Sequence, residues 1–314
     1  MVGGTLEATA HPMTPVSLNA TRSSRSAAPV PPQAHWCAGQ IALFTHRCAN
    51  DRSGTSEREL YVSAPCLVMT SRGGFLSRSP LGSVAADAST VVFRNAAEPY
   101  TVQDLGSRES VTIRLSPDLA REVLEDAGAS VSHVPRFTIA SAPVTVRAAL
   151  LHRTLLRDIK QADRGDPLQR EEAALDLVGE VVRASVSRDR FRVPPRLTGL
   201  ATARVVEARA FLSRTSGDCV RLADVATHVG CSPWHLSRAF RAATGESVRG
   251  YVLKLRLQAA LLRVLDSSQD LTNIAFECGF SDHSHLTVTF RKRFGVTPSR
   301  LRGMSLRQCR ALLA

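Results

Sequence analysis

The chain has 314 residues, and 44% of them are hydrophobic, a proportion that excludes a wholly disordered protein and allows about two folded domains. Its formal net charge of +12 favours a partner with negative charge, either nucleic acid or a membrane surface. No apolar run approaches the roughly 18 residues of a membrane-spanning helix, and the N-terminus lacks the apolar run of a signal peptide, so we expect no membrane partner. The seven widely spaced cysteines, without a C-x-x-C pattern, indicate the reducing cytoplasm.

The N-terminal half begins with an arm and continues as short strands. Residues 1–34 are rich in Ala, Pro, Ser, Thr and Gly and predict a disordered arm. Over 35–138, short apolar runs alternate with turn residues, which predicts a small β-barrel or sandwich. The predicted strands are Ile41–Thr45, Leu60–Val62, Cys66–Thr70, Val91–Arg94, Tyr100–Gln103 and Val111–Leu115. Ser116, as N-cap before Pro117, opens a helix that runs to about Asp126.

Residues 139–190 predict a helical hairpin with a short polar turn. The first helix is expected over Ala142–Gln161 and the second over Pro167–Val186. The apolar stripe of the second helix is expected at Leu168, Leu175, Val178 and Val182. This hairpin has two open alternatives, since it can pack on the β region or on a second copy of the chain to form a homodimer. Residues 191–203, with several Arg and Pro, predict a linker.

The last third contains one motif twice, within a C-terminal domain expected over 204–314. The two copies cover about 219–242 and 270–294, and each predicts a short helix, a glycine turn and a second helix. The inner faces of the two second helices are expected at Leu236 and Phe240 and at Leu286 and Phe290. A long helix over Ser247–Leu265 joins the copies. Its 19 residues span about 28 Å, so two recognition helices can lie roughly one DNA turn, about 34 Å, apart.

Turn and cap residues support this interpretation. Gly230 and Gly279 stand where a helix must end in a left-handed backbone, which glycine adopts at the least cost. Ser232 is expected to cap the second helix of the first copy, and Ser281 or Asp282 that of the second copy. The buried face of the first short helix is expected at Leu222, Val225 and Ala226. Each copy is therefore expected to be a helix-turn-helix.

The positive charge is concentrated in the same third of the chain. From Arg196 to Ala314 there are 18 Lys and Arg against 8 Asp and Glu, a net of +10, whereas the rest of the chain has a net of only +2. A solvated surface would spread its charge, but a surface that binds phosphates concentrates it. We therefore expect double-stranded DNA to be the partner.

The segment Leu222–Arg302 resembles the DNA-binding domain of the AraC/XylS family of transcription regulators. The motifs that carry this resemblance are Ser232–Phe240 with Thr244-Gly245, Ile274–Asp282 and Phe290–Pro298. The resemblance implies that the base-contacting residues are Trp234, Ser237 and Arg238 in the first unit and His283, Ser284, Thr287 and Val288 in the second. Val288 is a departure, because many members have Arg there, and Val can contact only a thymine methyl. We expect the first unit to supply more of the sequence discrimination.

The chemistry of the outward residues indicates contacts both to base edges and to the DNA backbone. Arg238 can pair with guanine O6 and N7, which would contribute about 1–3 kcal/mol of discrimination. The residues expected to contact phosphates are His235, Arg241, Arg291, Lys292 and Arg293. Such contacts set affinity rather than sequence preference.

The family resemblance also implies a sensing domain beside the DNA-binding domain. The segment Leu81–Tyr100 resembles the cupin-like effector domains of this family, so we expect a small-molecule effector. A metal-binding cupin would show His-x-His followed by Glu, and no such pattern is present, so we expect neither a metal nor a cofactor. One alternative is a zinc or redox site at His35-x-Cys37 and His46-x-Cys48, with Cys66 as a further ligand.

The expected fold class is α+β, with an N-terminal cupin-like barrel or sandwich, a helical hairpin and a C-terminal all-α domain whose two helix-turn-helix motifs are joined by a long helix. The expected function is a transcription regulator, an activator with RNA polymerase as a further partner. We expect no enzyme and no catalytic residue, because a P-loop, Gly-x-Ser-x-Gly and His-Glu-x-x-His are all missing. An architectural DNA-bending protein is the other alternative, in which Ser187–Ala314 alone would behave like the full chain.

Overall fold

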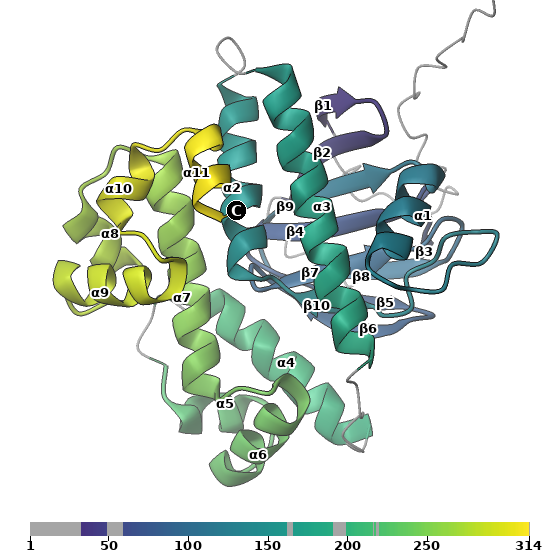
Figure 1. Ribbon diagram of the computed structural model, residues 1–314. Helices are drawn as coiled ribbons and strands as arrows, with labels where there is room; N and C mark the ends of the chain where they lie inside the picture. Colours follow the sequence, from purple (N-terminus) through teal and green to yellow (C-terminus); the bar gives the residue numbers. More distant parts are fainter. Residues whose placement is uncertain are drawn as a thin grey trace, which may run out of the picture.

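The computed structural model describes residues 33–48, 59–161, 166–190, 199–215, 217 and 220–313. Two β-sheets form a β region over 33–143, a helical hairpin covers one face of it, and helices of the C-terminal third lie against the hairpin (Figure 1). The predicted mixture of α and β structure is confirmed. The predicted arm lies outside the described residues, apart from Gln33 and Ala34, which belong to the first strand.

The strands of the described residues form two antiparallel sheets. The larger has the order β1-β2-β9-β4-β7-β10 and the smaller the order β3-β8-β5-β6. The larger sheet contains β1 (Gln33–Ala38), β2 (Ile41–Cys48), β4 (Cys66–Arg72), β7 (Thr90–Arg94), β9 (Arg108–Leu115) and β10 (Ser141–Pro143). The smaller contains β3 (Glu59–Leu60), β5 (Phe75–Ser79), β6 (Gly82–Ala86) and β8 (Tyr100–Asp104). All six predicted strands are present, whereas β1, β5, β6 and β10 were not predicted.

Two of the unpredicted strands show why local patterns failed. In β6 the residues are small and include few β-branched side chains, so its β-propensity is low. The strand β10 overlaps the start of the helix predicted over Ala142–Gln161, and this boundary was wrong. Ala142 and Pro143 pair with β7, and helix α2 (Val146–Lys160) begins only after Thr145, whose side chain accepts a hydrogen bond from the Ala148 N–H.

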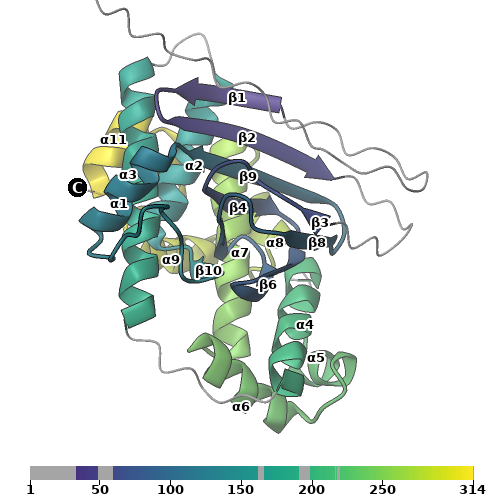
Figure 2. The same cartoon turned by 90° about the vertical axis from the view of Figure 1, so that its right-hand side faces the viewer.

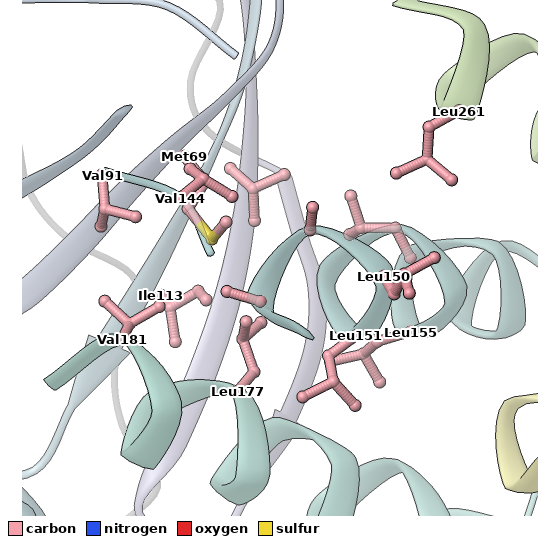
Figure 3. Packing of buried hydrophobic residues seen from close by; sticks show 14 of the residues in the cluster. Met69, Val91, Ile113, Val144, Leu150, Leu151, Leu155, Leu177, Val181 and Leu261 are labelled. Atoms are coloured by element: carbon pink, nitrogen blue, oxygen red, sulfur yellow. The ribbon is translucent and has the colours of Figure 1, made fainter. Parts of the chain in front are cut away.

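One face of the larger sheet forms the main hydrophobic core. Alternate residues such as Leu67, Phe93 and Ile113 share this face and are almost completely buried beneath the hairpin. Figure 3 shows how side chains from the strands, α2, α3 (Pro167–Arg190) and the long helix α7 (Val248–Asp266) gather into this single cluster. The helix α1 (Pro117–Asp126), capped by Ser116 as predicted, adds apolar residues to it.

The buried stripe of α3 differs from the predicted one. Val178 and Val182 are buried as expected, but the Leu168 side chain is 63% exposed and that of Leu175 is 41% exposed, so these two assignments were wrong. The stripe consists of Ala173, Ala174, Leu177, Val178, Val181 and Val182. The helix lies against both α2 and the sheet, so small side chains at two adjacent positions per turn allow close packing on each side. The hairpin thus packs on its own β region, and a homodimer stays a prediction.

The C-terminal third consists of eight helices within the described residues. These are α4 (Gly199–Thr215), α5 (Leu222–His228), α6 (Pro233–Thr244), α7, α8 (Leu271–Glu277), α9 (His283–Phe294), α10 (Pro298–Arg302) and α11 (Leu306–Leu313). The helix α4 begins inside the segment 191–203 predicted as linker. In Figure 2, α4, α5 and α6 lie at one end of α7, below the two sheets. No helix in the described part of the chain is long and apolar enough to cross a membrane.

Candidate DNA-binding surface

Two helix-turn-helix units are present where the repeat predicted them, α5–α6 and α8–α9. Their turns contain Gly230 with φ of +65° and Gly279 with φ of +77°, the left-handed backbone expected there. Val225 and Ala226 of α5 are buried, and so are Leu236 and Phe240 on the inner face of α6. The predicted burial of Leu222 was wrong, because its side chain is 38% exposed at the first turn of α5.

The N-caps of α6 and α9 are built differently. Ser232 Oγ accepts a hydrogen bond from the His235 N–H at 3.3 Å, as predicted for the first unit. In the second unit, the residue that caps α9 is Asp282 rather than Ser281, and its Oδ1 accepts from the His285 N–H at 2.7 Å. This backbone hydrogen bond, with a smaller contribution from the Ser281 hydroxyl, lowers the pKa of Asp282. A carboxylate at this end of the helix also stabilises it through the helix dipole.

Equivalent histidines reinforce both caps, a feature that sequence reasoning missed. His235 Nδ1 lies 2.9 Å from Ser232 Oγ, and His285 Nδ1 lies 3.1 Å from Ser281 Oγ. Each ring also packs edge-on against an aromatic neighbour, Trp234 in the first unit and Phe280 in the second. One ring nitrogen of His235 is therefore engaged by the cap, and the other remains for the phosphate contact expected of this residue. The matching positions of the two histidines in the repeat were the available signal.

The outward face of α6 carries a stacked pair. The Trp234 side chain is 60% exposed, so it does not belong to the core of the first unit. The Arg238 guanidinium lies 4.7 Å from the centre of the Trp234 ring, one helical turn away. Such a cation–π contact restricts the rotamers of the arginine. Ser237, between them, is also exposed.

The outward face of α9 is chemically weaker. His283, Ser284 and Val288 are exposed and Thr287 is half-buried, so the structure brings the four predicted residues onto one accessible helix. The Thr287 hydroxyl lies 3.3 Å from His283 Nε2, and these two polar groups therefore engage one another. The Val288 side chain is 69% exposed and offers neither a donor nor an acceptor.

Both second helices carry positive charge that is not paired within the described residues. Arg238, Arg241, Arg291 and Lys292 are exposed and Arg293 is half-buried, and none of them forms an ion pair with a residue that the structure describes. Several other basic groups of the C-terminal third are neutralised internally. The examples are Lys254 with Glu246 at 2.6 Å, Arg263 with Glu277 at 2.8 Å and Arg310 with Asp176 at 2.8 Å. The exposed Arg249, Arg300 and Arg307 also form no ion pair with a described residue, so free cations lie on α6 and α9 and on α7, α10 and α11 as well.

The two units have separate hydrophobic cores. The core of the first unit consists of side chains from α4, α5, α6 and the first half of α7, including Phe240 and Tyr251. The core of the second unit, including Leu286 and Phe290, is continuous with the cluster beneath the hairpin and the larger sheet. The second half of α7, with Leu261, belongs to this larger cluster (Figure 3).

A buried polar cluster links the first unit to the β region. Asp87, in the turn between β6 and β7, accepts hydrogen bonds from Tyr251 of α7 and, at 3.3 Å, from Arg209 of α4. Arg209 Nε also donates to the Tyr251 hydroxyl at 2.9 Å. Burial raises the pKa of Tyr251, so the phenol keeps the proton that it donates. Sequence reasoning missed this cluster because Asp87 and Tyr251 are 164 residues apart.

The candidate zinc or redox residues do not come together. Among the residues that the structure describes, no group of three His, Cys, Asp or Glu could hold a metal ion. Cys37 is exposed, Cys66 is buried in the β region, and Cys48 accepts a hydrogen bond from Arg108 at 3.3 Å. The side chain of His35 lies outside the described residues. This part of the chain therefore offers no support for the zinc alternative.

Comparisons with known proteins agree with the repeat. A helix-turn-helix domain family matches residues 225–304. A putative AraC-like transcription regulator of Streptomyces lividans is 25% identical over 80% of this chain and 82% of its own length. A probable transcription factor, PqrA, of Proteus vulgaris is 33% identical over 29% of this chain and 73% of its own length. The transcriptional activator RhaS of Mannheimia succiniciproducens is 34% identical over 21% of this chain, which covers 25% of the relative. All three are described as regulators of transcription.

Proposed function

The chain belongs to the AraC/XylS family of DNA-binding transcription regulators, and we propose that its helices α6 and α9 read two successive segments of the major groove. The observation that supports this most directly is the set of unpaired cations on the outward faces of these two helices. The long helix α7 has 19 residues, which gives it a length of about 28 Å, close to the rise of one DNA turn.

The proposed base contacts are unequal between the two units. In the first, Arg238 would donate to a guanine, held in position by Trp234, and Ser237 would contact a neighbouring base edge. In the second, His283, Ser284, Thr287 and Val288 would contact bases with fewer and weaker hydrogen bonds. The proposed phosphate contacts are His235, Arg241, Arg291, Lys292 and Arg293. Most of the sequence discrimination would therefore come from the first unit.

We also propose that the β region is a cupin-like sensing domain whose effector controls DNA binding. The support is the direct contact between this region and the first unit through Asp87, Arg209 and Tyr251. A conformational change at the turn between β6 and β7 would act directly on α7, because Tyr251 of α7 donates its hydrogen bond to Asp87 in this turn. The description of the relative RhaS as a transcriptional activator supports an activating role. RNA polymerase as a partner and the cytoplasm as the location stay predictions from the sequence.

Selection of bound duplexes from a random library tests the proposed reading of DNA. The full-length chain should enrich an asymmetric site, and Arg238→Ala should lose preference at one guanine while keeping the rest of the site. Arg183→Ala, an exposed arginine on α3 paired with Asp126, is the matched control and should enrich the unchanged site. Equal binding of all duplexes at moderate salt would contradict the proposal and would leave only an electrostatic anchor.

The same selection separates a sensing regulator from an architectural DNA-bending protein. The second unit shares its core with the hairpin and the larger sheet, so removal of the N-terminal regions would expose apolar surface on α7, α9 and α11. We expect the isolated Ser187–Ala314 fragment to be unstable rather than equivalent to the full chain. A stable fragment with full-length affinity and site preference would favour the architectural alternative.

A further inference from the structure

The face of the larger sheet that lies towards the smaller sheet carries arginines, whereas the face beneath the helices carries apolar side chains. Cys66 of β4 pairs with Arg94 of β7 on one side and with Arg114 of β9 on the other, so these three side chains share a face. Their chain neighbours, such as Leu67 and Phe93, point to the helices and form the main core. Because successive residues of a strand point to opposite faces, the two arginines face the smaller sheet, inside the β region.

Both arginines are buried, and aromatic rings cover them. Arg94 is 6% exposed and Arg114 is 7% exposed. The Arg94 guanidinium lies 3.5 Å from the centre of the Tyr100 ring, and that of Arg114 lies 4.7 Å from the Phe44 ring. A ring stacked on a guanidinium engages its flat face and leaves the N–H groups in its plane available. Arg94 Nη1 and Arg114 Nε are fully buried donors without a hydrogen-bond partner among the described residues.

The described groups around the two arginines supply no free negative charge. Burial raises the pKa of the Cys66 thiol, which lies between them in the sheet, to about 11. Burial also raises the pKa of Tyr100, and it lowers that of His46, together with Arg108 and Arg94, to about 4. Near neutral pH the thiol, the phenol and the imidazole are therefore all uncharged. The Asp104 carboxylate is paired with Arg108 at 2.6 Å.

A buried guanidinium without an anion is unfavourable, because its charge has lost water and gained no negative partner. The sheet carries two such groups at neighbouring positions. Stacking on Tyr100 and Phe44 satisfies the flat faces but not the in-plane donors. Arg94 and Arg114 stand two strand spacings apart, about 10 Å between backbones, with their side chains on the same face. An anion between them would be approached from both sides by N–H donors in a fixed planar geometry, which matches a carboxylate.

We propose that Arg94 and Arg114 form an anion site inside the β region that takes the carboxylate of a small organic acid. Binding at this site does not depend on the proposed reading of DNA. Its consequence for transcription rests on the proposed effector control, because β7 carries both Arg94 and Thr90, and the Thr90 hydroxyl accepts a hydrogen bond from Arg209 at 2.5 Å. A ligand that repositions β7 would therefore act directly on the cluster that holds the first unit.

Calorimetric titration of the full-length protein with acetate, hexanoate and benzoate, each at constant ionic strength, tests the site. Acetamide, hexanamide and benzamide are the neutral counterparts, and inorganic phosphate is the third arm. At least one carboxylate should bind, and its amide should bind at least about tenfold more weakly, because the amide lacks the charge that the two arginines require. This comparison needs only the wild-type chain, so it does not depend on whether a variant folds.

The variants Arg94→Gln and Arg114→Gln then test which residues hold the anion. Each should weaken carboxylate binding by about 10- to 100-fold, the loss expected for one charge-assisted contact. Arg136→Gln is the control, since Arg136 is an exposed arginine paired with Glu98, and its carboxylate affinity should stay within about twofold. Circular dichroism spectra establish that each variant is folded before titration.

Several results would overturn the proposal. These are equal binding of acid and amide, binding of phosphate without binding of any carboxylate, no carboxylate binding by the wild-type chain, or unchanged affinity in both arginine variants. Duplex binding by the same wild-type sample is measured without any carboxylate. Carboxylate binding without selective duplex binding would contradict the proposed function alone, and the reverse result would contradict this site alone.

Discussion

The two helix-turn-helix units have the same local architecture but are anchored in different ways. The second unit is fixed by apolar packing, because its inner side chains join the cluster that extends through the hairpin to the larger sheet. The first unit has a core of its own and contacts the β region through the polar cluster of Asp87, Arg209 and Tyr251. Apolar packing is spread over many contacts, whereas the polar cluster depends on three side chains that must keep their hydrogen bonds together.

We propose that this difference gives separate roles to the two copies of the motif. The unit that is held by polar contacts also has more polar groups on the face proposed to read DNA, with Trp234 stacked on Arg238, while the other unit presents Val288 at the equivalent position. Control of the first unit would thus change the reading of sequence, and the second unit would keep the protein in place on DNA. Four predictions test this contrast, and the largest expected effect comes first.

Core truncations should separate the two units most clearly. Phe240 and Phe290 occupy equivalent inner positions and are both fully buried, so each change to Ala should cost about 3–5 kcal/mol. Phe290→Ala should destabilise the hairpin and sheets together with the second unit, because they share one core. In Phe240→Ala, the first unit should unfold at a lower urea concentration than the rest of the protein.

The two tryptophans of the chain report on this experiment. Trp36 packs against the larger cluster and Trp234 lies on α6, so Trp234→Phe and Trp36→Phe each leave one reporter. Urea unfolding followed by fluorescence should show one common transition in Phe290→Ala and two separate transitions in Phe240→Ala. An unchanged Trp36 transition in Phe290→Ala would show that the second unit is not joined to the β region.

The polar cluster should contribute a smaller but specific part of the anchoring. Tyr251→Phe leaves the Asp87 carboxylate and Arg209 with one partner fewer in a buried site, which should cost about 1–3 kcal/mol. The loss should appear first in Trp234 fluorescence, because Tyr251 belongs to the core of the first unit. Thr244→Val, which removes a hydroxyl bonded only within its own unit, is the control for local loss without loss of anchoring.

Recognition should show the same asymmetry at the level of single bases. Arg238→Ala should reduce the preference for one guanine by about 1–3 kcal/mol, measured as relative affinities for a selected duplex and its single-base variants. Val288→Ala should change affinity by less than about 0.5 kcal/mol, since a surface valine makes no hydrogen bond. A larger effect for Val288→Ala than for Arg238→Ala would reverse the assignment of the two units.

The smallest expected effect is that of a phosphate contact on the second unit. Lys292→Ala should weaken binding to all duplexes equally and should reduce the slope of log affinity against log salt by about 1. Lys254→Ala is the matched control, because this lysine is paired with Glu246 at 2.6 Å and should leave the slope unchanged. A base-specific effect of Lys292→Ala would mean that α9 reads sequence through this side chain.

Features that depend on neighbours in the chain could be predicted from the sequence. The turns at Gly230 and Gly279 and the caps at Ser116 and Ser232 follow from local backbone chemistry, and the structure has them as expected. The inner faces of α6 and α9 follow from helical periodicity in the same way. The spacing of Trp234 and Arg238, four residues apart on a helix, could also have predicted their stack.

Features that depend on long-range packing could not be predicted. Pro143 occurs at the start of a helical pattern, but pairing with β7 draws it into a strand. Leu168 and Leu175 match an apolar stripe, yet α3 turns two small alanines to the core instead. The position of Asp87 beneath α4 and α7 is set by the contact between the β region and the C-terminal third, which no local pattern contains.

Protection of guanine N7 from methylation on a selected duplex tests the central claim most directly, because N7 lies in the major groove. The wild-type chain should protect two clusters of guanines about 10 base pairs apart, and Arg238→Ala should lose protection in one cluster only. A single protected cluster, two clusters on opposite faces of the duplex, or loss of both clusters in Arg238→Ala would contradict a protein that reads DNA with two separately anchored units.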